Sequence, residues 1–161
     1  LPEITLSTTK DHLDMCEAMQ NQLAEIGINI KIDVNPMVVQ KEFVAKSNLI
    51  FFRKNWIADY ADAENYLVLF YSKNFSPFGP NYTHFKNDRF DKLYEEAQMQ
   101  ANDSVRYEYY RQMDQIIMDE APVVVLYYDQ ILRLVQNNIT GLSNNPMNLL
   151  TLKRVKKVKL N

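Results

Sequence analysis

The chain has 161 residues and a net charge of −2 at pH 7, with 47% hydrophobic and 24% charged residues. This length allows one domain with a buried core, and the small negative charge favours neither nucleic acid nor an anionic membrane as a partner. Cys16 is the one cysteine, which excludes an internal disulfide and a cysteine-rich metal site. Because the chain begins at Leu1, inside a strand-like pattern, we expect it to be a piece of a longer protein.

The first part of the chain predicts a βαβ unit. Ile4 and Leu6 alternate with polar residues, which indicates a strand. Apolar residues then recur at three- and four-residue spacing over residues 13–23, which predicts an amphipathic helix that ends at Gly27. Residues 28–34 alternate strictly and give the clearest strand signal in the sequence. The two strands are therefore expected to be parallel, joined by a right-handed crossover.

The middle of the chain predicts short elements around a charged turn. Residues 38–45 favour a short helix, and residues 49–52 favour a strand that leads into the turn. A helix-like run follows over residues 66–71. Residues 72–82 contain prolines and a glycine and are expected to form a loop.

Two helices after this loop predict an αα-hairpin. Asn87 or Asp88 is expected to cap the first helix, and Asp103 or Ser104 the second. The apolar face expected of the first helix consists of Phe90, Leu93, Tyr94 and Ala97. The face expected of the second consists of Tyr107, Tyr110, Met113 or Asp114, Ile117 and Met118.

The remaining residues predict extended structure. Residues 123–128 form an uninterrupted β-branched and aromatic run, which is typical of a buried strand. Residues 131–135 are expected to continue extended, and residues 139–142 to turn. The tail over residues 152–160 mixes five cations with apolar residues, which indicates an exposed or edge strand, or a frayed end.

The turn over residues 52–66 is the strongest candidate for a functional site. It holds the one tryptophan, Trp56, together with three carboxylates and two tyrosines. Asp59, placed between Trp56 and Tyr60, would be a carboxylate in a partly desolvated aromatic setting, which suits a ligand ammonium. The alternative is that Asp59 or Asp62 caps the helix that follows, and on local sequence alone capping is the commoner role.

Other kinds of site find little support in the sequence. The two histidines, His12 and His84, have no second histidine or cysteine at ligand spacing, and three glycines do not make a phosphate-binding loop. No Gly-x-Ser-x-Gly motif occurs. A hydrolase that pairs Asp59 with Asp62 or Glu64 is the enzymatic alternative. Together these observations point away from catalysis, and no metal or other cofactor is expected.

Several motifs occur in the order that is typical of one protein family. The segment Trp56-Ile57-Ala58-Asp59-Tyr60, followed by Asp62 and Glu64-Asn65-Tyr66-Leu67, resembles the signature of the dipeptide-, oligopeptide- and nickel-binding family (family 5) of ABC-transporter solute-binding proteins. Further similarities are found in Gly79-Pro80-Asn81-Tyr82, in residues 87–93 and in the Ala-Pro strand over residues 121–128. The chain departs from the family pattern at Ala61 and Ala63, where prolines are usual, and at Asn55, where glycine is usual.

The resemblance implies an α/β fold of the type II periplasmic-binding-protein class. In that fold two lobes close over a ligand, and each lobe has a mixed sheet with flanking helices. Residues 1–142 would form most of one ligand-binding lobe, and residues 143–161 would be a C-terminal segment that returns to the other lobe.

The resemblance also implies a function and a set of site residues. Asp59 would bind the free amino terminus of a dipeptide or oligopeptide, with Trp56 and Tyr60 as walls of the amine pocket. Arg53 would lie near the carboxylate end of the peptide, and Asn81 would contact the ligand from the glycine-asparagine loop. The alternatives within the family are a nickel complex, haem or an oligosaccharide.

The same resemblance implies where the protein works and with what. The chain would be a monomeric, periplasmic or cell-envelope component of an ABC importer, lipid-anchored in its full-length form. Its partners would be the peptide ligand and the ABC permease subunits in the membrane.

Overall fold

The computed structural model describes residues 3–128, 130–145 and 147–159. The elements, in chain order, are β1 (Ile4–Thr8), η1 (Lys10–His12), α1 (Leu13–Glu25), β2 (Ile30–Val34), α2 (Met37–Ala45), β3 (Phe51–Phe52), α3 (Glu64–Leu67), η2 (Val68–Phe70), η3 (Ser72–Asn74), α4 (Asp88–Met99), α5 (Asp103–Glu120), β4 (Ile139–Thr140) and β5 (Lys156–Lys157). Across the described ranges, no helix combines the length and apolar character needed to cross a membrane.

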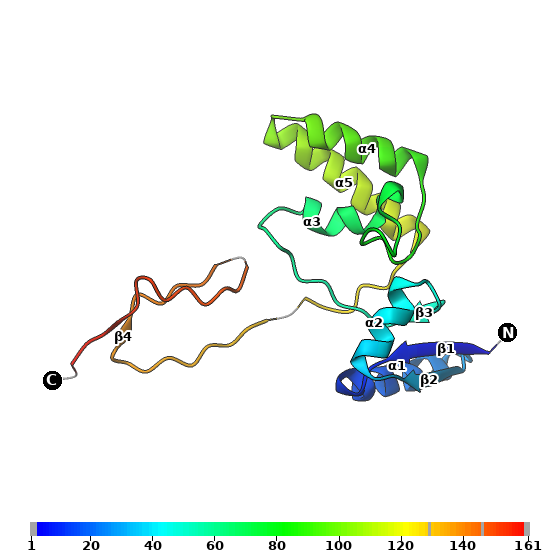
Figure 1. Cartoon of the computed structure of the whole chain (residues 1–161), viewed down its shortest axis with the longest axis horizontal. Helices are drawn as coiled ribbons and strands as arrows, with labels where there is room; N and C mark the ends of the chain where they lie inside the picture. Colours follow the sequence, from blue (N-terminus) through cyan, green and yellow to red (C-terminus); the bar gives the residue numbers. More distant parts are fainter. Residues whose placement is uncertain (1–2, 129, 146, 160–161) are drawn as a thin grey trace.

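The N-terminal elements form a three-stranded parallel sheet in the order β2-β1-β3 (Figure 1). The register pairs Leu6 with Ile32 on one side and with Phe51 on the other, so the predicted parallel βαβ unit is confirmed. Helix α1 covers the sheet, and Cys16 is fully buried against Leu6 and Ile30. The helix stops where Gly27 adopts a φ of 80°, a conformation that glycine takes at little cost.

The second packed unit is the predicted αα-hairpin of α4 and α5. Asn87 caps α4, because its side chain accepts a hydrogen bond from Phe90 N at 2.9 Å. The predicted apolar face of α4 is fully confirmed, since its four members Phe90, Leu93, Tyr94 and Ala97 are buried. They form the core with residues of α5 and with Leu67 and Phe85.

Helix α5 corrects the prediction in two respects. Its cap is Asn102, which accepts hydrogen bonds from Ser104 N and Val105 N, so the cap lies just before the predicted Asp103 or Ser104. Its buried face consists of Tyr110, Met113, Ile116 and Ile117, whereas the predicted Tyr107 and Met118 are about half exposed. Met118 follows Met113 by five residues, which is about 140° round the helix and away from α4.

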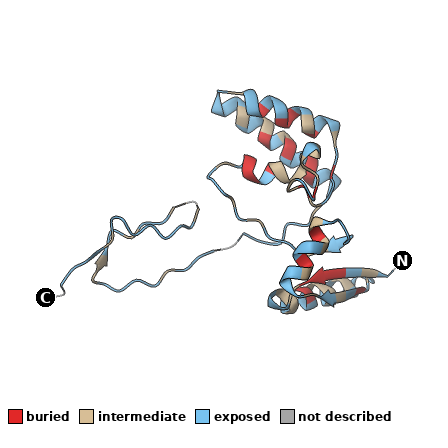
Figure 2. Cartoon of the chain, in the orientation of Figure 1, coloured by how far each residue is buried: buried red, intermediate tan, exposed pale blue. Residues whose placement is uncertain are grey.

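The segment after α5 differs most from prediction. The predicted buried strand over residues 123–128 is not formed, and the side chains from Val124 to Tyr128 are exposed by 44–82%. Among the described residues no strand lies beside this segment to pair with its backbone, so its β-forming composition has no ladder to join. We call residues 122–159 the extended arm. Figure 2 shows that buried residues are confined to the sheet and helical units, not the arm.

The far end of the arm contains one small antiparallel ladder. Strand β4 pairs with β5 through Ile139 with Lys157 and Thr140 with Lys156. Both residues of β5 are exposed, which agrees with the exposed strand predicted for the lysine-rich tail. The predicted division of the chain at residue 142 falls within this arm and stays a prediction.

Candidate functional site

The candidate turn over residues 52–66 contains the connection from β3 to α3, which runs between the sheet unit and the helical unit (Figure 1). Asp59 lies near its middle and is exposed. Within the described part of the chain, the carboxylate of Asp59 makes no hydrogen bond or ion pair; only its backbone N–H is bonded. The side chain is therefore available to an outside cation.

Ala63 is the N-cap residue of α3, and Asp62, rather than Asp59, supports the start of this helix through its side chain. Asp62 Oδ1 accepts a hydrogen bond from Glu64 N at 2.9 Å, at the first residue of α3. Asp62 Oδ2 also lies 3.3 Å from Arg106 Nη2 on α5. Burial, and next the hydrogen bond to Asp62, raise the pKa of the Tyr110 hydroxyl above its ordinary value. Of the two candidate aspartates, one thus holds the helix and the other remains free.

Glu64 attaches the turn to the helical unit. Its side chain is buried, and its two oxygens accept hydrogen bonds from the hydroxyls of Tyr60 and Tyr94. The pKa of Tyr94 is raised first by burial and second by its hydrogen bond to Glu64. The pKa of Tyr60 is also raised, mainly by its own hydrogen bond to Glu64. Tyr60 is 49% exposed, so its ring remains at the surface while its hydroxyl is held by Glu64.

Asn65 holds the turn from inside. It is 3% exposed, and its Oδ1 accepts hydrogen bonds from Trp56 Nε1 at 2.9 Å and from Asp59 N at 3.1 Å. One amide oxygen is therefore hydrogen-bonded both to Trp56, the predicted wall of the amine pocket, and to Asp59, the predicted residue that binds the amine. Sequence reasoning assigned no role to Asn65, because an asparagine in the first turn of a helix has several ordinary explanations.

Arg53 lies at the carboxyl end of the parallel sheet, where β3 adjoins β1. Its N–H donates to Ser7 O at 2.9 Å, and its guanidinium donates to Asn55 Oδ1 and, at 3.4 Å, to Tyr127 Oη. Its Nε is buried and has no hydrogen-bond partner in the described structure. The same is true of Thr8 Oγ1 at the end of β1.

This edge of the sheet is a usual place for a ligand. Because β2 and β3 lie on opposite sides of β1, the chain changes direction between β1 and β3, and ligands bind at the carboxyl ends of strands at such a switch point. Burial and then the charge of Arg53 lower the pKa of His12.

Asn81 is positioned differently from the other predicted site residues. It is fully buried, and its Nδ2 donates to Tyr71 O and Phe85 O. Its Oδ1 accepts from Thr83 Oγ1 and from Phe85 N. The side chain thus stabilises the loop before α4, and the geometry favours this structural role. Its predicted ligand contact stays a prediction.

The predicted residues are therefore only partly brought together. Trp56, Asp59 and Tyr60 lie in one turn, and Arg53 begins the same segment at the end of β3. Asn81 belongs to the loop before α4. In the part of the chain that the structure covers, no group of three or more His, Cys, Asp or Glu side chains is placed to hold a metal ion.

Comparison with known proteins shows a similarity to one family. Residues 1–78 match the family described as "Bacterial extracellular solute-binding proteins, family 5 Middle". The similarity to this family therefore lies in 78 of the 161 residues. The matched family consists of solute-binding proteins, so the similarity favours binding over the hydrolase alternative.

Individual proteins are similar to the chain over most of its length. The dipeptide-binding protein DppE of Bacillus subtilis (strain 168) is 27% identical over 156 residues, which cover 95% of this chain and 28% of DppE. The oligopeptide-binding protein OppA of the same strain is 28% identical over 144 residues, covering 88% of this chain and 26% of OppA.

A solved structure shows the fold. The Escherichia coli murein tripeptide binding protein MppA matches with a TM-score of 0.81 at 22% identity, covering 98% of this chain and 31% of MppA. The predicted type II periplasmic-binding-protein fold is thereby confirmed. The chain spans 26–31% of the length of these three relatives.

Proposed function

We propose that this chain belongs to family 5 and is part of an extracytoplasmic receptor that binds peptides by their free amino terminus and delivers them to an ABC permease. The observation that carries the proposal is the exposed Asp59 carboxylate, which has no partner in the described structure and lies in a turn fixed by Asn65. A carboxylate held in this way gives a ligand ammonium a charge-assisted hydrogen bond, which is among the stronger polar contacts in proteins. The names of the relatives, which are dipeptide-, oligopeptide- and tripeptide-binding proteins, favour a peptide ligand.

The aromatic side chains on either side of Asp59 give the site its second property. Trp56 and Tyr60 each use their polar atom inside the protein, on Asn65 and Glu64 respectively. Their rings are left to contact the ligand amine, where an aromatic face attracts a cation. We assign them to the walls of the amine pocket.

The carboxyl end of the sheet is the proposed place for the other end of the peptide. The terminal N–H groups of the Arg53 guanidinium lie at the surface beside Asn55 and Tyr127, and an arginine suits a carboxylate because its N–H groups match both carboxylate oxygens. Arg53 therefore extends the proposal from the amine of the peptide to its carboxylate. The receptor would be a monomer in the periplasm or cell envelope, lipid-anchored there.

The test compares a free peptide with its N-acetylated form, by calorimetric titration of the intact receptor. Acetylation removes the ammonium, so the unaltered receptor is expected to bind the acetylated peptide at least about thirtyfold more weakly, which corresponds to about 2 kcal/mol. Asp59→Asn should bring the two affinities together. Asp114→Asn removes an exposed carboxylate of α5 and is the matched control, expected to leave the preference intact. Equal affinities for both peptides in the unaltered receptor would exclude amine recognition.

A further inference from the structure

Two parts of the binding turn meet at one buried atom. Asn65 Oδ1 accepts hydrogen bonds from the indole N–H of Trp56 and from the backbone N–H of Asp59. These two residues are three positions apart, and both precede Asn65 in the chain. An amide oxygen has two lone pairs, and both are used here. Of the residues that the structure describes, Asn65 is the one whose side chain is hydrogen-bonded to Asp59.

The other polar contacts of the turn act elsewhere. Asp62 bonds to Arg106, and Glu64 bonds to Tyr94, so both attach the later half of the turn to the helical unit. Neither reaches Asp59. The orientation of the segment from Trp56 to Asp59 therefore depends on Asn65 rather than on these contacts.

The sequence makes this dependence stronger. Ala61 and Ala63 both leave φ free, whereas a proline would fix it near −65°. A turn without such restriction has more conformations to lose when it orders, and a side-chain acceptor that holds two donors reduces that freedom in the folded state. Loss of the acceptor would leave two donors without their partner and release the segment that carries Asp59.

We propose that Asn65 is the positioning residue of the amine site: its Oδ1 holds the Asp59 backbone and the Trp56 indole in one arrangement, so that carboxylate and aromatic wall are presented together. The inference rests on the proposed function and adds to it the residue that preorganises the site. Binding then depends on Asn65 although it does not touch the ligand, because a preorganised site avoids the cost of ordering on association.

The experiment measures the selectivity of the intact receptor, defined as the ratio of its Kd for an N-acetylated peptide to its Kd for the free peptide. Asn65→Leu has a similar size and no acceptor, and it is expected to lower this ratio about tenfold. Asn65→Ala carries the same expectation and serves if the leucine variant does not fold. Thermal melts establish that each variant is folded at the assay temperature.

Two further measurements separate positioning from general stability. The indole N–H resonance of Trp56, assigned by its absence in Trp56→Phe, should shift and lose protection from hydrogen exchange in Asn65→Leu. Asn65→Asp keeps the accepting oxygen and should retain both the resonance and the selectivity. Its added charge is controlled by the double variant Asp59→Asn with Asn65→Asp, which should remain unselective.

The outcomes keep this inference apart from the proposed function. If Asp59→Asn abolishes selectivity while both folded Asn65 variants retain it, the positioning role is overturned and the amine site stands. If Asp59→Asn retains selectivity, the proposed amine site fails and the inference about Asn65 fails with it. The expected result is that Asp59→Asn and the Asn65→Leu or Asn65→Ala variants lose selectivity, whereas Asn65→Asp retains it.

Discussion

Asp62 Oδ2 lies 3.3 Å from Arg106 Nη2, and this ion pair joins the binding turn to helix α5. Arg106 also pairs with Asp103 Oδ1 at 3.0 Å, so one guanidinium bridges the start of its own helix and the turn. The side chains of Asp62 and Arg106 are 24% and 27% exposed. Solvent and salt therefore screen the attraction between their charges less than in a fully exposed surface pair. The pair is thus a structural link between α5 and the segment that carries Asp59.

Replacing Arg106 by methionine is expected to loosen this link. Arg106→Met keeps much of the side-chain length but leaves Asp62 without its cation, so the melting temperature of the chain should fall by about 2–4 °C. The matched control is Arg111→Met on the same helix. Arg111 pairs with Glu108 at the surface, where its side chain is 76% exposed, and such pairs contribute little. Equal melting temperatures for the two variants would show that the Arg106 link carries no stability.

Glu64 is expected to matter more than Asp62, because its carboxylate is buried and serves two tyrosines. Glu64→Gln keeps one accepting oxygen and replaces the other with an N–H donor that faces a hydroxyl. The free energy of unfolding should fall by about 1–3 kcal/mol, as for one buried polar group left without its partner. Urea unfolding measures the change.

A double-mutant cycle gives the control for Glu64. Tyr94→Phe removes one of the two donors, so its combination with Glu64→Gln should cost less than the sum of the single changes. Strict additivity of the two changes would mean that Glu64 and Tyr94 do not interact in solution.

Local patterns in the sequence predicted most of the packed part of this fold. The strict alternation over residues 28–34 and the apolar spacing from Phe90 to Ala97 each allow one buried face, so the βαβ unit and α4 followed from short-range periodicity. The cap of α5 was misplaced because Asn102, Asp103 and Ser104 are all good caps, and only the backbone geometry chooses among them.

The extended arm and the roles within the turn could not be predicted in this way. The run from Val123 to Tyr128 favours a strand, but a strand needs a neighbouring strand, and none is present among the described residues. In the turn, Asp59 and Asp62 are chemically identical candidates for capping. Only the three-dimensional contacts of Asp62 with Glu64 N and Arg106 separate the aspartate that holds the helix from the one whose carboxylate is left free.

Alkaline pH should destabilise the helical unit through Tyr94. Its pKa is raised above the ordinary value of 10.0 by burial and by Glu64, so the folded state keeps the proton at a pH where the unfolded state loses it. The stabilisation is complete below pH 10 and is lost as the pH rises above it. Urea unfolding between pH 8 and about pH 11 should therefore show a smaller loss of stability in Tyr94→Phe than in the unaltered chain. Tyr128→Phe, which changes an 82% exposed ring, is the control and should keep the full loss.

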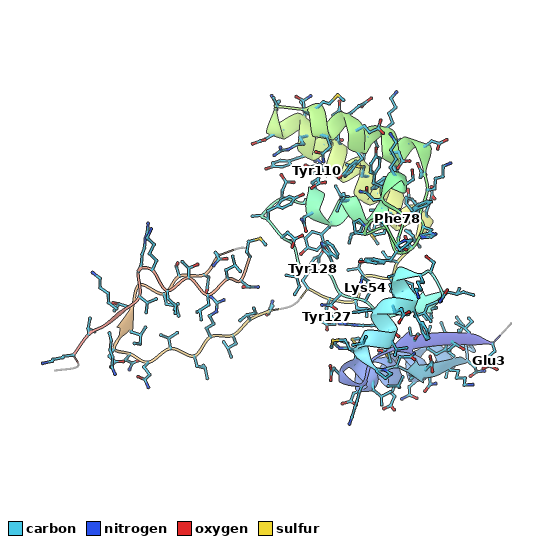
Figure 3. The ribbon with its side chains drawn as sticks, in the orientation of Figure 1. Glu3, Lys54, Phe78, Tyr110, Tyr127 and Tyr128 are labelled. Atoms are coloured by element: carbon cyan, nitrogen blue, oxygen red, sulfur yellow. The ribbon has the colours of Figure 1, made fainter. Side chains whose placement is uncertain are left out.

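The extended arm should make the isolated chain associate with itself. Leu132 and Leu134 are 85% and 92% exposed. The β-forming run over residues 123–128, which contains the Tyr127 and Tyr128 labelled in Figure 3, has no strand beside it in the described structure. An unpaired extended segment of this composition is a template for pairing with another copy. Sedimentation velocity should show oligomers that grow with concentration, and Leu132→Lys combined with Leu134→Lys should shift the isolated chain towards monomer.

The control for association places the same charge on a packed unit. Met99 is 88% exposed at the end of α4, so Met99→Lys also replaces an exposed apolar side chain by lysine, but away from the arm. It should leave the oligomers unchanged, because the unpaired backbone of the arm, rather than exposed apolar surface in general, provides the contact. The intact receptor should sediment as a monomer if the remaining part of the receptor covers the arm. A monomeric isolated chain at every concentration would show that the exposed arm does not drive association.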